Sequence, residues 1–282
     1  MDSKTRAPFS IEPIAGALGV EIRGVDLAAS LDDGVIASIR RALLDYLVVF
    51  FRDQAVSPEQ LVAFGRRFGT LAHYPFVQGL PGHPEVIEVK KLEHEGTNFG
   101  GIWHSDTTYL DEPPMGSMLY ALEVPPVGGD TLFANMFMAY EQLSEGMKEV
   151  LARLRAVSSS AKADVSRTRE DRIASAPGKE AQKVFEAAHP VVRTHPESGR
   201  KALYVNVAHT TRFAGMTVEE SAPILNWLHQ HQARPEFTCR FQWQVGSLAF
   251  WDNRCTHHNP INDYHGHRRV MHRITLKGDK PR

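Results

Sequence analysis

The sequence predicts one mainly β domain, a sandwich or barrel core with several helices around it. Short alternating or apolar runs typical of strands recur at regular spacing, and only a few longer stretches show helical periodicity. The length of 282 residues allows a single β domain with a sizeable buried core. We see no internal repeat.

The first part of the chain alternates strands with two helices. Residues 10–27 alternate apolar and polar side chains around glycines and predict short strands joined by a tight turn. An amphipathic helix is predicted over 31–46, and a buried strand at 48–51. Residues 57–60 (SPEQ) combine an N-cap, a proline at the first helical position and a capping-box glutamine, so a helix should begin there and end at Gly69.

From residue 84 onward strands dominate the pattern. Strands are predicted at 86–89, 103–109, 118–122, 191–193, 202–205, 238–243, 247–251 and 268–276. Helices are predicted over 135–155 and, from a capping box at 217–220, to about residue 231. Residues 158–180 are polar with alternating charges, and we expect a mobile insertion or lid there within the single domain 1–282.

Composition limits the classes of partner. Lysine and arginine number 32 against 33 acidic residues, a net charge of −1 that argues against nucleic-acid binding. No apolar run approaches the roughly 20 residues of a membrane span, and we see no signal peptide. Cys239 and Cys255 are the only cysteines, so we expect no disulfide framework and a cytoplasmic enzyme or binding protein.

The strongest local motif is Trp-His-Ser-Asp at 103–106. On a strand, His104 and Asp106 would share one face and could hold one metal ion. They would supply two ligands of the 2-His-1-carboxylate triad that leaves positions open on Fe(II). A distant histidine would complete it, and both His257 and His258 are candidates. His-x-Asp alone is common, so a purely structural role is the alternative.

Two arginines lie on one face of the predicted strand 268–276. Arg269 and Arg273 are separated by about 13 Å along that face. Inside a barrel each would need an anion, because an unpaired buried charge is costly. A solvated edge strand with both arginines facing outward is equally compatible with the alternation.

Taken together, these motifs resemble a known family. They are Trp-His-Ser-Asp at 103–106, Gly-Gly-Asp-Thr at 128–131, Trp-Asp-Asn-Arg at 251–254, His258, and Arg-Arg-Val-Met-His-Arg at 268–273. In this order and spacing they resemble the taurine dioxygenase/2,4-dichlorophenoxyacetate dioxygenase family, over nearly the whole chain. The resemblance implies a double-stranded β-helix (jelly-roll, cupin-like) core, an Fe(II) cofactor, and 2-oxoglutarate and O₂ as co-substrates.

The resemblance also implies metal and co-substrate ligands. His104, Asp106 and His258 would bind the iron, with the family spacing selecting His258 over His257. Thr131 and Arg269 would bind the distal carboxylate of 2-oxoglutarate.

The resemblance also implies residues that bind the substrate, and this part of the sequence differs from the taurine-specific members. Arg273 would hold the anionic group of the substrate, with His73 beside it. Taurine-specific members carry polar residues just before the Trp-His motif, whereas here only Asn98 could serve, next to the apolar Phe99. We therefore expect a small organic anion with an alkyl or aryl body: a sulfonate, a sulfate ester or an aryloxyalkanoate.

The implied reaction is hydroxylation of a C–H next to the heteroatom of that anion, with release of succinate and CO₂. Three alternatives remain open: taurine dioxygenase proper, a Zn²⁺-dependent hydrolase that uses the same His, Asp and His, and a non-catalytic jelly-roll binding protein. We also expect a homo-oligomer, either a dimer or a tetramer.

Overall fold

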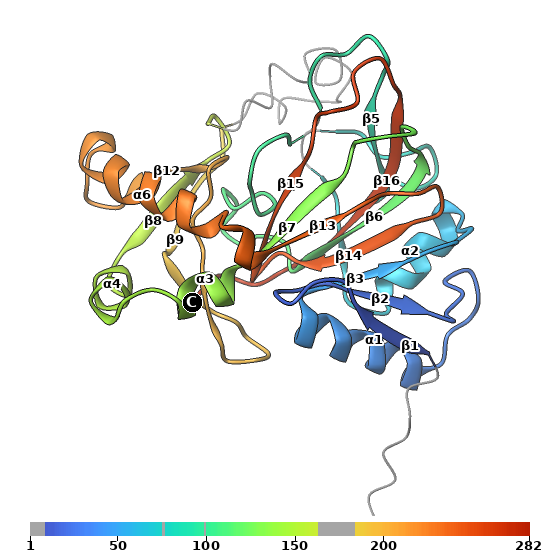
Figure 1. The fold of residues 1–282 in the computed structure, drawn as a ribbon, viewed down its shortest axis with the longest axis horizontal. Coiled ribbons are helices and arrows are strands. Elements are labelled where there is room, and N and C mark those ends of the chain that lie inside the picture. The colour runs from blue at the N-terminus through green and yellow to red at the C-terminus, as the bar shows by residue number, and fades with distance from the viewer. Residues whose placement is uncertain (1–8, 75–76, 99, 163–183) are drawn as a thin grey trace, which may run out of the picture.

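The computed structural model describes residues 9–74, 77–98, 100–162 and 184–282 (Figure 1). Its strands are β1 (Ser10–Pro13), β2 (Val20–Arg23), β3 (Val48–Phe51), β4 (Leu71–Ala72), β5 (Ile87–Lys91), β6 (Gly116–Glu123), β7 (Thr131–Asn135), β8 (Arg155–Ser159), β9 (Glu186–Pro190), β10 (Val192–Thr194), β11 (Lys201–Leu203), β12 (Thr210–Phe213), β13 (Thr238–Phe241), β14 (Leu248–Asp252), β15 (Thr256–Pro260) and β16 (Arg269–Leu276). Its helices are α1 (Asp33–Tyr46), α2 (Pro58–Arg66), α3 (Met136–Glu141), α4 (Glu145–Leu151), α6 (Val218–Gln232) and the 3₁₀ turn η2 (Pro235–Phe237).

Two facing β-sheets form the core (Figure 1). The larger sheet runs β1-β2-β3-β14-β6-β16-β4, with β5 also paired to β16, and the smaller runs β13-β7-β15. Within these two sheets only β2 and β3 pair in parallel. The core is the predicted mainly β jelly roll, and its strands bring distant parts of the chain to one interior.

The strand β3 shows how the larger sheet is buried on both faces. Phe50 points between the two sheets, where it stacks on Phe241 with ring centroids 4.0 Å apart. Phe51 points to the opposite face and meets Phe64 of α2 edge-on. Successive side chains of a strand alternate between faces, so the all-apolar run 48–51 predicts this two-sided burial. The helices α1 and α2 cover the outer face (Figure 1).

Two predicted elements differ from the structure. The helix predicted over 135–155 is two helices: α3 ends at Glu141, and Ser144 begins α4 as its N-cap by accepting a hydrogen bond from the Met147 N–H. The strand predicted at 103–109 is a loop with a single bridge, between His104 and His258. Thr107 in this loop has φ = 42°, which no extended strand allows.

The first residues of the predicted insertion 158–180 belong to a strand. Ser158 and Ser159 belong to β8, which pairs with β9 and β12. The Ser160 N–H also bonds to the Phe185 carbonyl. Residues 163–183 lie outside the described part of the chain. Among the helices that the structure does describe, none has the length and apolar character needed to cross a bilayer.

Candidate metal and co-substrate site

Two imidazoles and one carboxylate meet inside the jelly roll. One donor atom each from His104, Asp106 and His258 lies within 4.8 Å of the others. Oδ1 of Asp106 is 3.8 Å from Nε2 of His104 and 3.9 Å from Nε2 of His258. All three side chains are buried. Nitrogen and oxygen donors that converge in this way are those of the facial triad that holds Fe(II), so the donor set suits this metal.

Backbone contacts fix the two histidines relative to each other. The N–H of His104 bonds to the carbonyl of His258 at 3.0 Å, and the reverse bond measures 2.8 Å. Nδ1 of His104 lies 2.7 Å from the Ile102 carbonyl, so it carries the proton and leaves Nε2 free as a ligand. Gly100 has φ = +71°, and a Cβ there would lie only 2.8 Å from the His104 ring. The glycine thus lets the chain pass beside this imidazole.

The strand β15 separates the two neighbouring histidines. His258 packs against Trp251 and Phe133 between the sheets, with its Nε2 toward Asp106. His257, the next residue, projects to the other face because side chains alternate along a strand. It is buried, and its Nε2 has no hydrogen-bond partner among the described residues. The geometry therefore favours His258 as the ligand.

The carboxylate of Asp106 uses its two oxygens differently. Oδ2 accepts a hydrogen bond from Ser117 at 2.7 Å and pairs with Nη2 of Arg273 at 2.7 Å. Oδ1 is left facing the two histidines. Burial acts to raise the pKa of Asp106, but the Arg273 guanidinium and the hydrogen bond from Ser117 oppose it, and the pKa lies below its ordinary value. The group is therefore an anion ready to ligate through Oδ1.

Burial lowers the pKa of both His104 and His258, because a charged imidazole is poorly solvated here. Both rings are therefore neutral at neutral pH, as metal ligation requires. Burial also lowers the pKa of two nearby histidines, His209 and His257, to about 3.

These shifts predict that the metal-free protein loses stability in mild acid. Below about pH 6.5 the unfolded chain takes up protons on these histidines, whereas the folded chain does not. Each histidine should then lower the free energy of unfolding by about 1.4 kcal/mol per pH unit, down toward its folded pKa. Urea unfolding of chelator-treated protein at pH 7.5, 6.5 and 5.5 measures this. A free energy of unfolding that stays constant over this range would contradict the prediction. The variant His257→Gln lacks one of these histidines, so its free energy of unfolding should fall by about 1.4 kcal/mol less per pH unit.

A buried arginine and a threonine lie at the other end of the same cavity. Arg269 is 5% exposed, and within the described part of the chain its Nε and Nη2 have no hydrogen-bond partner. The hydroxyl of Thr131 accepts a bond from the Trp243 indole at 2.9 Å, which leaves its own proton free to donate. Both residues line a narrow cavity with His104 and His258. Unpaired buried guanidinium donors require an anion, and the distal carboxylate of 2-oxoglutarate would satisfy them.

The four residues predicted to bind the substrate do not all lie in the cavity of the metal ligands. Arg273 lies in the interior beside Asp106, and the Tyr74 ring lies 5.8 Å from its guanidinium. His73 lines a separate cavity next to Tyr74. Asn98 is buried but donates to the Pro260 carbonyl, so it is tied to β15. Phe99 lies outside the described residues.

The sequence does not predict three residues that contact the candidate ligands. Ser117 holds the carboxylate of Asp106, Trp243 orients Thr131, and Asn253 contacts both Ser117 and the backbone of Asp106. Asn253 stands within the Trp-Asp-Asn-Arg motif, which is the one signal that could have found it.

Comparison with known proteins agrees with this site. Residues 10–275 match the family model described as taurine catabolism dioxygenase, TauD, TfdA family. The chain belongs to this family of dioxygenases. It is an Fe(II)- and 2-oxoglutarate-dependent dioxygenase, and with O₂ these groups supply the oxidising chemistry.

Three relatives illustrate the range of substrates in the family. The chain is 33% identical over 286 residues to an alpha-ketoglutarate-dependent sulfate ester dioxygenase of Pseudomonas putida, covering 98% of this chain and 93% of the relative. It is 32% identical to an alpha-ketoglutarate-dependent 2,4-dichlorophenoxyacetate dioxygenase of Cupriavidus pinatubonensis, with 93% and 95% covered. A crystal structure of a taurine dioxygenase from Burkholderia xenovorans is 38% identical with a TM-score of 0.80, covering 97% and 92%.

Proposed function

We propose that this enzyme hydroxylates the carbon next to the heteroatom of a small organic anion: an alkyl sulfate, an alkanesulfonate or an aryloxyalkanoate. In this proposal His104, Asp106 and His258 hold Fe(II), and Arg269 with Thr131 binds 2-oxoglutarate. The observation that carries the substrate class is Arg273, a buried cation placed directly beside the metal ligand Asp106.

The charge of the site supports an anionic substrate. Arg273 is 4% exposed, and its Nη2 is bound to Asp106, while its Nε has no hydrogen-bond partner among the residues described in the structure. Fe(II), Arg269 and Arg273 together carry four positive charges. Asp106 and the two carboxylates of 2-oxoglutarate neutralise three of them. One positive charge remains in a buried site, and a singly charged substrate would neutralise it.

A cavity of about 260 Å³ supports a substrate with an apolar body. It is the cavity that His73 and Tyr74 line, and Thr107, Leu110 and Pro114 also line it, together with the charged Glu112 and Lys277. Tyr74 connects it to Arg273, whose guanidinium lies 5.8 Å from the Tyr74 ring. Thr107 directly follows the ligand Asp106, and its buried hydroxyl has no partner among the residues that the structure describes. The cavity therefore offers apolar groups, a hydroxyl next to a metal ligand, and the cation of Lys277, which suits an organic sulfate or sulfonate.

The chemistry of the product follows from where the oxygen enters. Hydroxylation of the carbon that carries a sulfate ester gives R–CH(OH)–OSO₃⁻, which collapses to an aldehyde and hydrogensulfate. The same step next to a sulfonate releases sulfite, and next to an aryl ether it releases a phenol. Succinate and one of these fragments should therefore appear in equal amounts.

A comparison of taurine with propane-1-sulfonate distinguishes the proposed substrate class from the alternative, taurine dioxygenase proper. They have similar length and the same sulfonate, but only taurine carries an ammonium group. Among the described lining residues the only carboxylate is the exposed Glu112, so an ammonium group in this cavity would lose its water without a buried carboxylate to replace it. We expect kcat/KM, measured as O₂-dependent succinate release, to favour propane-1-sulfonate by at least about tenfold.

A tenfold preference for taurine would contradict this substrate class and return the assignment to taurine dioxygenase proper. Glu112, which lines the cavity at an exposed position beside Lys277, and Asn98 would then be the amine-binding candidates. Glu112→Gln measured with both substrates would identify which residue acts.

We further infer a cytoplasmic location. Both cysteines, Cys239 and Cys255, are buried and free. Unpaired thiols are compatible with a reducing compartment. Fractionation of cells that express the full chain, with detection by antibody, tests the location directly.

A further inference from the structure

Asn253 occupies the turn between β14 and β15, which leads directly to His258. It is 1% exposed, and its backbone and side chain both reach the metal-ligand loop. The Asn253 carbonyl accepts a hydrogen bond from the Ser105 hydroxyl at 2.7 Å, and its Oδ1 accepts one from the Asp106 N–H at 3.4 Å. Oδ1 also accepts from the Trp251 indole at 2.9 Å, and Nδ2 donates to Oγ of Ser117 at 3.1 Å.

The hydroxyl of Ser117 has only one orientation in this network. A serine hydroxyl has one proton and two acceptor lone pairs. Its oxygen accepts from Nδ2 of Asn253 at 3.1 Å and from Nη2 of Arg273 at 3.3 Å, and both groups are donors only. The single proton must therefore point to Oδ2 of Asp106, 2.7 Å away. Asn253 and Arg273 thus together restrict the serine proton to Oδ2.

We propose that Asn253 is a positioning residue for the metal ligand Asp106, acting through the hydroxyl of Ser117. Its amide directs the serine proton to Oδ2, so Oδ2 is held by two donors and Oδ1 alone faces His104 and His258. Without the amide, the Ser117 oxygen keeps only the longer bond from Arg273, so the hydroxyl that holds Oδ2 of Asp106 is less firmly oriented. This inference rests on the proposed role of Asp106 as a metal ligand.

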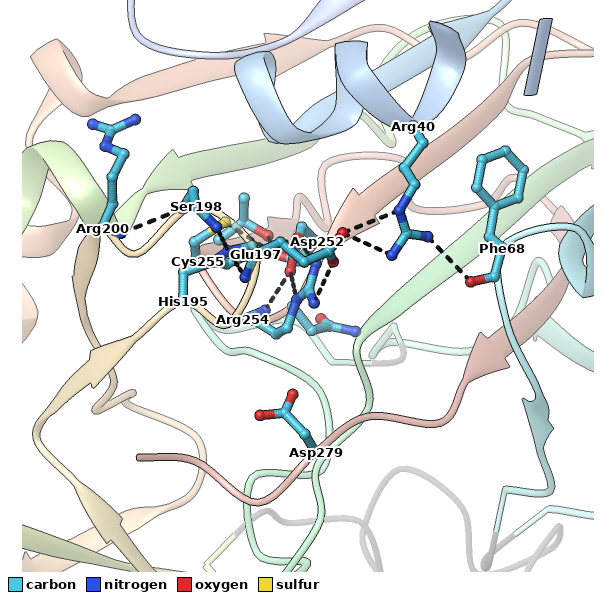
Figure 2. Close-up of polar contacts among 12 residues, drawn as sticks. Arg40, Phe68, His195, Glu197, Ser198, Arg200, Asp252, Arg254, Cys255 and Asp279 are labelled. Atoms are coloured by element: carbon cyan, nitrogen blue, oxygen red, sulfur yellow. Dashed lines mark hydrogen bonds and ion pairs between the residues drawn. The ribbon is translucent and has the colours of Figure 1, made fainter. Parts of the chain in front are cut away.

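The two residues that flank Asn253 in this turn, Asp252 and Arg254, are held by a cluster of ion pairs (Figure 2). Asp252 accepts two bonds from Arg254, at 2.8 and 2.6 Å, and pairs with Nε2 of His195 at 3.0 Å. Arg254 also pairs with Glu197 at 2.8 Å, and Glu197 pairs with Arg40 of α1 at 2.7 Å. Because Arg254 and His195 use both oxygens of Asp252, this cluster is a structural anchor for the turn.

The test compares Asn253→Ala with Asn135→Ala. Asn135 is a matched control because it is equally buried, caps α3 and donates to the Ala17 carbonyl, away from the metal ligands. The measured quantities are the Kd of Mn(II) for the metal-free protein, the visible absorption of the anaerobic Fe(II)–2-oxoglutarate complex, and the Tm. We expect Asn253→Ala to weaken Mn(II) binding about 10- to 100-fold, as loss of outer partners of metal ligands does, and to alter the absorption band. Asn135→Ala should lower the Tm without changing either signal.

A second pair of variants keeps the proposal testable if Asn253→Ala fails to fold. Ser117→Ala removes only the hydroxyl, and Ser221→Ala, in a buried serine on α6, is its control. Ser117→Ala should weaken Mn(II) binding to a similar degree, and Ser221→Ala should not. When both single variants fold, the double variant should be little weaker than the worse single one, since both remove the same hydrogen bond.

Two results would overturn the proposal while leaving the proposed function intact: an unchanged Mn(II) Kd in Asn253→Ala, or an unchanged Kd in Ser117→Ala. Failure of the unmodified protein to bind any divalent metal would instead contradict the proposed function itself. The two failures are therefore distinguishable.

Discussion

Replacing His258 with alanine should abolish measurable binding of Mn(II) or Fe(II), whereas His257→Gln should leave it within about twofold. The Nε2 of His258 faces the same carboxylate oxygen as that of His104, and His257 projects from the other face of β15. Loss of a direct ligand should exceed the roughly 100-fold loss seen for outer partners of metal ligands. Isothermal titration of the metal-free protein at pH 7.5 measures both affinities.

The two substitutions control for each other, because both remove a buried imidazole. The Tm of each variant, measured without metal, shows whether it folds. Retained binding in a folded His258→Ala, together with loss of binding in His257→Gln, would transfer the ligand role to His257.

Arg269→Ala should weaken 2-oxoglutarate binding by about 100- to 1,000-fold and leave Mn(II) binding nearly unchanged. The guanidinium is buried with Nε and Nη2 unpartnered, so a carboxylate there gains charge-assisted hydrogen bonds that nothing else supplies. Loss of one partner of such a buried pair costs several kcal/mol, which corresponds to this range. Arg269→Lys should recover little, because a lysine cannot bind a carboxylate through two parallel bonds.

The measurement is an anaerobic titration of the Fe(II)-loaded protein with 2-oxoglutarate, followed by visible absorption. Arg234→Ala, which removes an exposed arginine paired with Glu236, is the control and should titrate like the unmodified protein. Loss of metal from Arg269→Ala with unchanged 2-oxoglutarate affinity would show that Arg269 serves the metal loop instead.

The sequence predicts most of what depends on local pattern and order. The run 48–51 predicts a strand buried on both sides, and the capping box at 57–60 predicts the start of α2, as the structure has them. The resemblance in motif order indicates the family, which the comparison confirms. The roles assigned to Arg269, Thr131 and Arg273 stay predictions, but all three side chains lie inside the jelly roll rather than on a solvated edge.

What the sequence could not predict depends on tertiary contacts. The alternation at 103–109 predicts a strand. In the structure, the side chains of Ser105, Asp106 and Thr108 form hydrogen bonds with residues of other segments, and the backbone does not pair as a strand beyond one bridge. Nothing in the run GSMLYAL around Ser117 distinguishes this serine from any other small residue of a strand. Its position beside Asp106 follows only from the pairing of β6 with β16, where Ser117 lies opposite Thr275.

The paired bonds between His104 and His258 have a consequence for the order of folding. More than half of the chain separates these residues, so their contact closes a very long loop and forms only after the strands around it have paired. An unfolded chain therefore has no preformed place for the ion, and metal cannot act as a nucleus. Its binding energy should appear almost wholly in a slower unfolding rate, so that the loaded enzyme is kinetically protected while the rate of refolding stays that of the metal-free chain.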